Sequence, residues 1–220
     1  AYEIYQCDWS SDVCSSDLRL GARLLIAPFS LDVGQGEIVT LMGPSGSGKS
    51  SLLSFIGGDL DGPIEGVGDV EVDGRSVAPL PPERRRIGRQ FQDDFLFPHM
   101  TVGENLLFGM GGAERGARMA EALAEAGLTG FAARAPHTLS GGERSRVALL
   151  RSLLAEPRVM LLDEPFAKLD ADLRQAIRDF TFRNLAGRGI ATLLVSHDRA
   201  DAPAGGRVLR VSPTGELHDD

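Results

Sequence analysis

Short apolar runs bounded by glycine, proline or charged residues recur along the chain. They occupy residues 37–42 (EIVTLM), 158–162 (RVMLL), 191–196 (ATLLVS) and 207–212 (RVLRVS). As a set they lack the strict alternation of apolar and polar positions that marks a strand with one solvent-exposed face. The runs therefore predict buried strands of a mainly parallel sheet.

Patterns with helical periodicity lie between these runs, at residues 49–58, 117–128, 143–156 and 169–187. Strands that alternate with helices predict a three-layer α/β domain. The interval 93–156 shows helical patterns and no convincing strand, so we interpret it as a helical lobe inserted between two parts of an α/β core, 19–92 and 157–220. We expect one compact unit, with a small antiparallel β part near the N-terminus.

Residues 1–18 differ in composition from the rest of the chain. They hold the only tryptophan and both cysteines, Cys7 and Cys14, and no basic residue. The stretch 8–18 resembles the translation of a sequencing-library adapter, so we interpret residues 1–18 as artefactual and expect them to be unpaired and extended. The alternative is a genuine acidic, disordered tail. In both cases the two cysteines do not predict a disulfide or metal pair, and a remainder without cysteine suits a reducing cytosol.

Charge and hydropathy narrow the class of protein. The formal net charge of -8 over 220 residues disfavours a general nucleic-acid surface. A basic patch formed by Arg84, Arg85, Arg86 and Arg89 has an alternative interpretation as a solvated turn. No apolar run approaches the roughly 20 residues that cross a bilayer, and no leader pattern is visible. We therefore expect a cytoplasmic protein that reaches a membrane only through a partner.

The segment GPSGSGKS at residues 43–50 fits the pattern G-x-x-x-x-G-K-[ST] and lies between a predicted strand and a predicted helix. In that context glycines let backbone N–H groups converge on phosphate oxygens at a helix N-terminus. Lys49 is expected to reach the β- and γ-phosphates of a nucleotide, and Ser50 to bind Mg²⁺. The alternative is a glycine-rich turn without a ligand. The predicted nucleotide-binding residues here are Gly43, Pro44, Ser45, Gly46, Ser47, Gly48, Lys49, Ser50 and Ser51.

Two carboxylates follow the apolar run VMLL, at Asp163 and Glu164. At the end of a buried strand beside the phosphate loop, Asp163 is suited to hold the magnesium, through water. Glu164 is suited to polarise a water that attacks the γ-phosphate. An acidic residue after a strand is often only a helix cap, so the two carboxylates alone are a weak signal. Together with the phosphate loop they predict a site of nucleotide hydrolysis.

His197 and Gln92 are weaker candidates. His197 ends the apolar run 191–196, where it could reach the γ-phosphate or the attacking water, although a single histidine is more often structural. Gln92 lies where the sheet is expected to give way to the helical lobe, and its amide could ligate the metal and orient water. Both are predicted to take part in catalysis, Gln92 also as a metal ligand.

These motifs in this order, together with LSGGE at 139–143 and KLD at 168–170, resemble the ATP-binding subunits of ABC transporters from Arg19 to the end of the chain. LSGGE is the most specific element. The resemblance implies a P-loop NTPase (RecA-like) fold, ATP and Mg²⁺ as ligands, and an ATPase that dimerises head to tail. It implies that the second copy's γ-phosphate is gripped by Ser140, Gly141 and Gly142. Asp170 would lie across the dimer seam, and Leu20 stands where a stacking aromatic usually covers the adenine.

The segments DEPFAKLDADLR at 163–174 and VALLRSLLAEP at 147–157 resemble the ATPases of bacterial binding-protein-dependent importers, with the thiamine type nearest. This implies an integral membrane permease, a periplasmic or lipoprotein solute-binding protein, and a location on the inner face of the membrane. The apolar stretch 93–109 could line a groove for the permease or simply form the core of the helical lobe. The alternatives are an exporter or lipoprotein-release ATPase, a soluble ABC ATPase, and a non-catalytic nucleotide-binding regulator.

Overall fold

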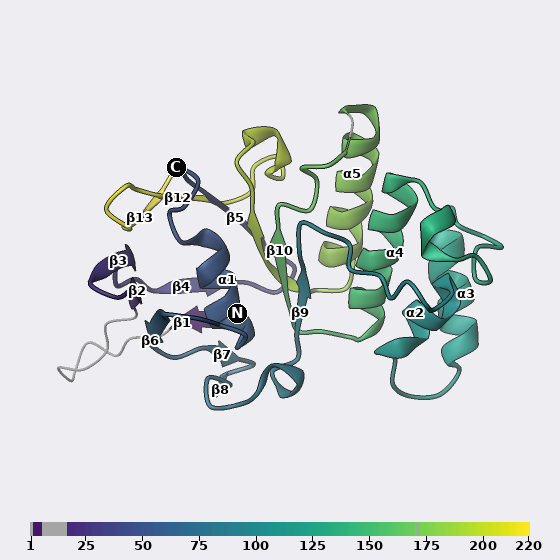
Figure 1. The fold of residues 1–220 in the computed structure, drawn as a ribbon, viewed down its shortest axis with the longest axis horizontal. Helices are drawn as coiled ribbons and strands as arrows, with labels where there is room; N and C mark the ends of the chain where they lie inside the picture. Colours follow the sequence, from purple (N-terminus) through teal and green to yellow (C-terminus); the bar gives the residue numbers. More distant parts are fainter. Residues whose placement is uncertain (1, 6–16, 170) are drawn as a thin grey trace.

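The computed structural model describes residues 2–5, 17–169 and 171–220, and its centre is a six-stranded sheet (Figure 1). The strand order is β13-β12-β5-β11-β10-β9. Within this sheet the strands β5, β9, β10, β11 and β12 are parallel to one another, and β13 is antiparallel to β12. Their bounds are β5 Ile38–Met42, β9 Ile87–Gln90, β10 Val159–Asp163, β11 Ala191–Val195, β12 Val208–Val211 and β13 Leu217–Asp219. All four predicted strands are confirmed.

Strand β9 was not predicted, and its sequence explains why. Ile87 is its only large apolar residue, and Arg89 lies in its centre. The strand pairs along β10 through main-chain hydrogen bonds that carry no hydropathy signal. Its position matters for function, because β9 leads the chain directly to Gln92.

The side chains of the central strands divide into two hydrophobic cores, one on each face of the sheet. Val39, Leu41, Leu161 and Leu193 pack into one core, with apolar residues of helix α1 (Lys49–Gly57). The positions between them, including Met160 and Leu194, pack into the other core, with helices α4 (Gly141–Leu154) and α5 (Ala171–Gly187). Because successive residues of a strand point to opposite faces, this division accounts for the continuous apolar runs.

The described residues form five α-helices: α1 Lys49–Gly57, α2 Val102–Phe108, α3 Arg115–Glu125, α4 Gly141–Leu154 and α5 Ala171–Gly187. The four predicted helical patterns correspond to α1, α3, α4 and α5. Helix α2 falls in the stretch 93–109 and begins with a capping box between Thr101 and Glu104. Helices α2, α3 and α4 lie together at one end of the molecule (Figure 1). No helix of the described residues is long and apolar enough to cross a membrane.

Small antiparallel sheets form the other end of the molecule (Figure 1). Strand β1 (Tyr2–Tyr5) pairs with β4 (Leu31–Val33). Strand β2 (Asp17–Leu20) lies between β3 (Arg23–Ile26) and β6 (Ile64–Val67). The short strands β7 (Glu71–Val72) and β8 (Arg75–Ser76) form a hairpin. Three 3-10 turns complete the regular structure: η1 Pro82–Arg84, η2 Pro136–Thr138 and η3 Arg199–Asp201.

These sheets correct the expectation that residues 1–18 are unpaired. Residues 2–5 pair with β4, and Asp17 and Leu18 pair with β6. Leu18 is 1% exposed and belongs to the core on the α1 face. The expectation was wrong because it rested on composition, whereas tyrosine and isoleucine favour strands and an edge strand offers unpaired main-chain groups. Residues 6–16, which include both cysteines, lie outside the described residues.

The arginine cluster that follows β8 is not a free basic surface. Arg85 is buried and donates hydrogen bonds to the main-chain oxygens of Leu80, Ala78 and Ile56, at 2.7–2.9 Å. Arg89 pairs with Asp59. At least these two side chains are part of the fold, so both earlier interpretations of the cluster, a basic patch and a solvated turn, are wrong for them.

Candidate functional site

The glycine-rich segment between β5 and α1 forms a tight loop. Gly43 has a φ of 155°, and a Cβ at that position would lie 2.9 Å from the carbonyl oxygen of Val211. Gly48 has a φ of 91°, and a Cβ there would lie 3.1 Å from the Cβ of Leu25. Both positions require glycine for conformation and for space. The loop therefore lies close to strands β12 and β3, immediately before the first turn of helix α1.

Helix α1 begins at this loop without a side-chain cap. Gly48 occupies the N-cap position in the left-handed conformation and, being glycine, has no side chain that could accept a hydrogen bond from the helix. The N–H groups of the first helical turn are therefore left for a ligand, and the helix dipole favours an anion there. A phosphate group fits this position because it accepts several such hydrogen bonds at once.

Lys49, the first residue of α1, folds its ammonium group back over the loop. Its Nζ donates hydrogen bonds to the carbonyl oxygens of Gly43 at 2.9 Å and Pro44 at 2.8 Å. The residue is 8% exposed, and burial lowers the pKa of the ammonium group. The Ser47 hydroxyl, 3.4 Å from Nζ, is a further partner. A buried cation surrounded mainly by neutral dipoles gains from an anionic ligand, which phosphate would supply.

Ser50 and Asp163 meet beside the loop. The Ser50 hydroxyl donates a hydrogen bond of 3.1 Å to Oδ1 of Asp163, although the residues are 113 positions apart. Burial raises the pKa of Asp163, and the bond from Ser50 opposes this shift. A hydroxyl and one carboxylate are hard oxygen ligands of the kind that hold Mg²⁺ together with water and phosphates. The described residues contain no cluster of three or more acidic, histidine or cysteine side chains that could hold a metal alone.

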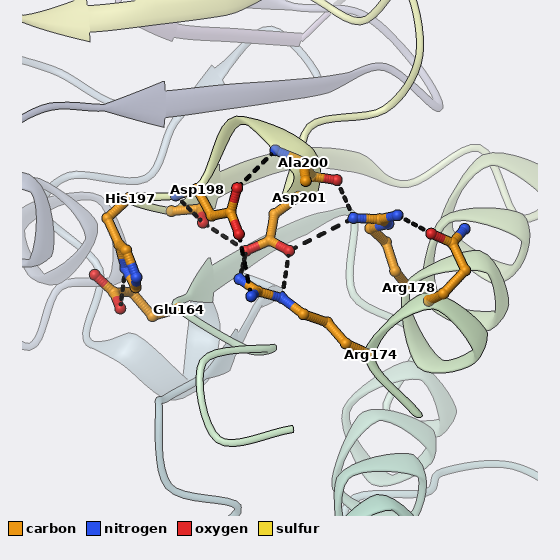
Figure 2. A network of polar contacts seen from close by, with 9 residues as sticks. Glu164, Arg174, Arg178, His197, Asp198, Ala200 and Asp201 are labelled. Carbon is orange, nitrogen blue, oxygen red and sulfur yellow. Dashed lines mark hydrogen bonds and ion pairs between the residues drawn. The ribbon is translucent and has the colours of Figure 1, made fainter. Parts of the chain in front are cut away.

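Glu164 and His197 form a hydrogen-bonded pair at the same edge of the sheet (Figure 2). Nδ1 of His197 lies 2.9 Å from Oε2 of Glu164. Glu164 follows β10 with a φ of 48°, and its backbone N–H donates to the carbonyl oxygen of Val195 in β11 at 3.0 Å. This left-handed conformation is uncommon for a residue other than glycine and turns the carboxylate away from the strand direction. Two strand ends thus bring together residues that the sequence could only suggest separately.

Gln92 lies two residues beyond Gln90, which pairs with Leu162 of β10. It is therefore at the same edge of the sheet as Glu164, but its side chain is exposed. Together with Asp94, Gly141 and Pro165 it lines a hollow of about 450 Å³. The structure thus brings Gln92 to the beginning of α4 rather than into hydrogen-bonding contact with Ser50 or Asp163.

The LSGGE segment forms the beginning of helix α4. The Ser140 hydroxyl accepts a 3.3 Å hydrogen bond from the N–H of Glu143, whose carboxylate accepts a 2.7 Å bond from the N–H of Ser140. Gly142 is buried against α5, where a Cβ would lie 2.5 Å from Leu173. Gly141 and Ser140 are exposed.

Within one chain helix α1, which follows the loop at 43–50, and helix α4, which follows the Ser140 turn, pack against opposite faces of the sheet. The apolar residues of α1, such as Leu53, pack into one core, and those of α4, such as Val147, into the other. No hydrogen bond among the described residues joins the Ser140 turn to the loop at 43–50. One copy therefore does not bring its own two loops together.

Two further candidates remain, and the structure describes only one of them. Leu20 ends β2 and is 39% exposed, so its apolar side chain is available to a flat ligand without offering an aromatic ring. Asp170 lies outside the described residues.

Sequence reasoning missed the polar residues that hold the His197 loop. Arg174 of α5 and Asp198 and Asp201 after β11 form ion pairs around it (Figure 2). The acidic residues right after His197 were a signal in the sequence, but Arg174 looks like any exposed helix residue.

Comparisons with known proteins agree with this geometry. The sequence model of a family described as ABC transporter matches residues 26–167. The chain is 42% identical over 207 residues to the "uncharacterized ABC transporter ATP-binding protein YnjD" of Escherichia coli K12, covering 92% of this chain and 95% of that protein. It is 44% identical over 187 residues to the Fe(3+) ions import ATP-binding protein FbpC of Mesorhizobium japonicum, covering 83% of this chain and 52% of that protein. The spermidine/putrescine import ATP-binding protein PotA of Methylococcus capsulatus is 40% identical over 203 residues, covering 90% and 52%. The chain thus spans about half the length of these two import proteins.

Two solved structures of the cassette MJ0796 resemble this one. A dimer described as a post-hydrolysis state bound to ADP and Pi has a TM-score of 0.75 at 32% identity. It covers 94% of this chain and 95% of its own. A second dimeric structure, described as a bacterial ABC transporter cassette, has a TM-score of 0.76 at 31% identity over the same shares of the two chains.

Proposed function

The chain belongs to the ABC transporter family and is an ATPase of the P-loop fold, and we propose that its ATP hydrolysis drives solute import through a membrane permease. The observation that carries the hydrolysis part is the convergence of five residues at one edge of the sheet. Lys49, Ser50 and Asp163 meet at the phosphate loop, and Glu164 holds His197 at 2.9 Å beside them.

Each of these residues has a role that its surroundings support. Lys49 and the uncapped start of α1 bind the β- and γ-phosphates. Ser50 and Asp163 hold Mg²⁺, which neutralises phosphate charge when bound. Glu164 orients and polarises the attacking water, and His197 keeps that carboxylate in place and reaches toward the γ-phosphate. We also assign Gln92 to this group, because it follows β9 at the same edge of the sheet.

We propose further that two copies share each nucleotide. Helices α1 and α4, which begin at the phosphate loop and at the Ser140 turn, pack against opposite faces of the sheet. A second copy is therefore needed to bring the two kinds of loop to one ATP. The similar dimeric structure described as bound to ADP and Pi supports this arrangement. ATP then closes the dimer, and hydrolysis opens it because the products repel each other. Asp170 at the seam remains part of the proposal.

The partner in the membrane is the next part of the proposal. Phe95 and Phe108 are 61% and 63% exposed, which is unusual for large apolar side chains. Phe108 contacts Phe97 at 4.6 Å between ring centroids, so the aromatic rings are gathered near α2. This surface suits a permease helix at the inner face of the membrane. The thiamine-type solute and a periplasmic or lipoprotein binding protein stay predictions from the sequence.

The substitution Glu164→Gln tests the hydrolytic site. It keeps the size of the side chain and removes its ability to take a proton from water. We expect ATP turnover to fall by roughly a hundredfold or more while ATP binding is kept. Light scattering with saturating MgATP is then expected to report a dimer. An active Glu164→Gln variant would exclude this residue as the base, and a monomer in saturating ATP would exclude the shared site.

A further inference from the structure

The loop that carries His197 is fastened to helix α5 by a buried fork. Arg174 donates from Nε to Oδ1 of Asp201 at 2.9 Å and from Nη2 to Oδ2 at 2.6 Å (Figure 2). The Asp201 side chain is 2% exposed, whereas that of Arg174 is 22% exposed. Two parallel hydrogen bonds between a planar guanidinium and a carboxylate fix direction as well as distance. The fork therefore sets where η3 sits against α5.

Further contacts extend this fastening to both sides of His197. The Ser196 hydroxyl, just before it, donates to Oδ2 of Asp201 at 2.7 Å. The Asp198 carboxylate, just after it, lies 3.1 Å from Nη1 of Arg174. Asp198 also accepts a 2.9 Å bond from the N–H of Ala200. His197 is thus the one residue between two that are held, and its own side chain is 61% exposed.

Little else holds the imidazole in place. Its described hydrogen-bond partner is Glu164, and a ring that is 61% exposed has little packing to fix its rotamer. The position of the loop backbone therefore determines whether Nδ1 stays within hydrogen-bonding distance of the Glu164 carboxylate. That backbone position depends on Asp201, which is buried and must keep a cationic partner.

We propose that Arg174 and Asp201 are positioning residues for ATP hydrolysis, which hold His197 in contact with Glu164. This inference rests on the proposed function of Glu164 and His197 as the hydrolytic pair. Neither Arg174 nor Asp201 is expected to touch nucleotide. Loss of the fork should therefore slow turnover without weakening ATP binding.

The test uses two variants of the full chain. Asp201→Asn keeps the shape and removes the charge, and Arg174→Lys keeps the charge and removes the fork. We expect kcat for MgATP to fall about tenfold to a hundredfold, as for a displaced catalytic group, with KM and the Kd for ATP within about twofold of the wild type. If Asp201→Asn does not fold, Arg174→Lys decides, because it leaves Asp201 beside a cation.

Arg85→Lys is the matched control. Arg85 is also buried and also uses its guanidinium in several hydrogen bonds, but it binds main-chain oxygens including Ile56 near the far end of α1. The Arg85→Lys substitution should lower Tm and leave kcat unchanged at temperatures below the unfolding transition. A folded Arg174→Lys protein with wild-type kcat would overturn the positioning role. An equal fall in kcat for Arg85→Lys would do so too, by tracing the loss to stability. A wild-type protein without turnover would instead refute the proposed function.

Discussion

Ser140→Ala separates the two duties of the turn at the beginning of α4. In the free protein Ser140 is a helix cap, with a 3.3 Å bond from the N–H of Glu143. In the proposed dimer its hydroxyl contacts a γ-phosphate held by the second copy. Alanine removes the hydroxyl and keeps the 2.7 Å bond between the Ser140 position and the Glu143 carboxylate, because that bond uses the main-chain N–H.

The two duties predict effects of different size. Loss of an N-cap costs about 1 kcal/mol, and half of this capping box remains. For a chain of this length that corresponds to a fall in Tm of about 2–4 °C. A hydrogen bond to a charged group contributes about 1.5–3 kcal/mol. If the hydroxyl binds the γ-phosphate in the transition state, kcat/KM should fall roughly 10- to 150-fold.

The structure contains a matched control in the second capping box. Thr101 caps α2 with a 3.2 Å bond from the N–H of Glu104, whose carboxylate accepts a 2.7 Å bond from the N–H of Thr101. Thr101→Ala should lower Tm by a similar amount and leave the ATPase activity of the isolated subunit unchanged. Calorimetry and a steady-state phosphate-release assay measure the two quantities. Equal kcat/KM values for the two variants would refute the assignment of Ser140 to the nucleotide.

Three further outcomes follow from the site. Burial raises the pKa of Asp163, so the ionised carboxylate makes the folded protein less stable at neutral pH. Asp163→Asn should therefore raise Tm in magnesium-free buffer while abolishing Mg²⁺-dependent turnover. A lower Tm would contradict the desolvation argument. Gly142→Ala would place a Cβ 2.5 Å from Leu173 and should destabilise the protein by about 1–3 kcal/mol in denaturant titration, whereas unchanged stability would mean that α4 and α5 separate freely. Hydrogen bonds from the backbone and hydroxyl of its cap lower the pKa of Glu143, so the stability that its ionised form provides is present above the unfolded value of about 4.3 and is lost as pH falls through the folded pKa. The Tm difference between the wild type and Glu143→Gln should therefore shrink as pH falls below about 4.3 and vanish once the pH is below the folded pKa, and a constant difference would argue against an ionic contribution.

The sequence predicted those parts of the fold whose signal is local. The apolar runs of β5, β10, β11 and β12 are continuous because both faces of the sheet are buried. The loop at 43–50 is recognisable because glycine is required at fixed positions. Strand β9 was missed because its pairing rests on main-chain bonds around a charged Arg89.

The site was predictable as a set of residues but not as a geometry. Ser50 and Asp163 are 113 positions apart, and their contact follows from the strand order rather than from any spacing. The same holds for Arg174 and Asp201, which are 27 positions apart. Pairing of residues 2–5 was missed for a different reason, because an unusual composition does not prevent main-chain hydrogen bonds to an edge strand.

The loop at 43–50 and the Ser140 turn differ in a way that suits a shared site. The start of α1 has no side-chain cap and a buried Lys49, so it attracts a phosphate by itself. The start of α4 already has its cap, and the Glu143 carboxylate lies at the same helix end. A carboxylate there weakens the attraction for a free anion. In the proposed dimer the Ser140 turn should therefore bind a γ-phosphate well only when Lys49 and magnesium of the other copy neutralise it, so the proposed closure should depend on bound MgATP rather than on phosphate alone.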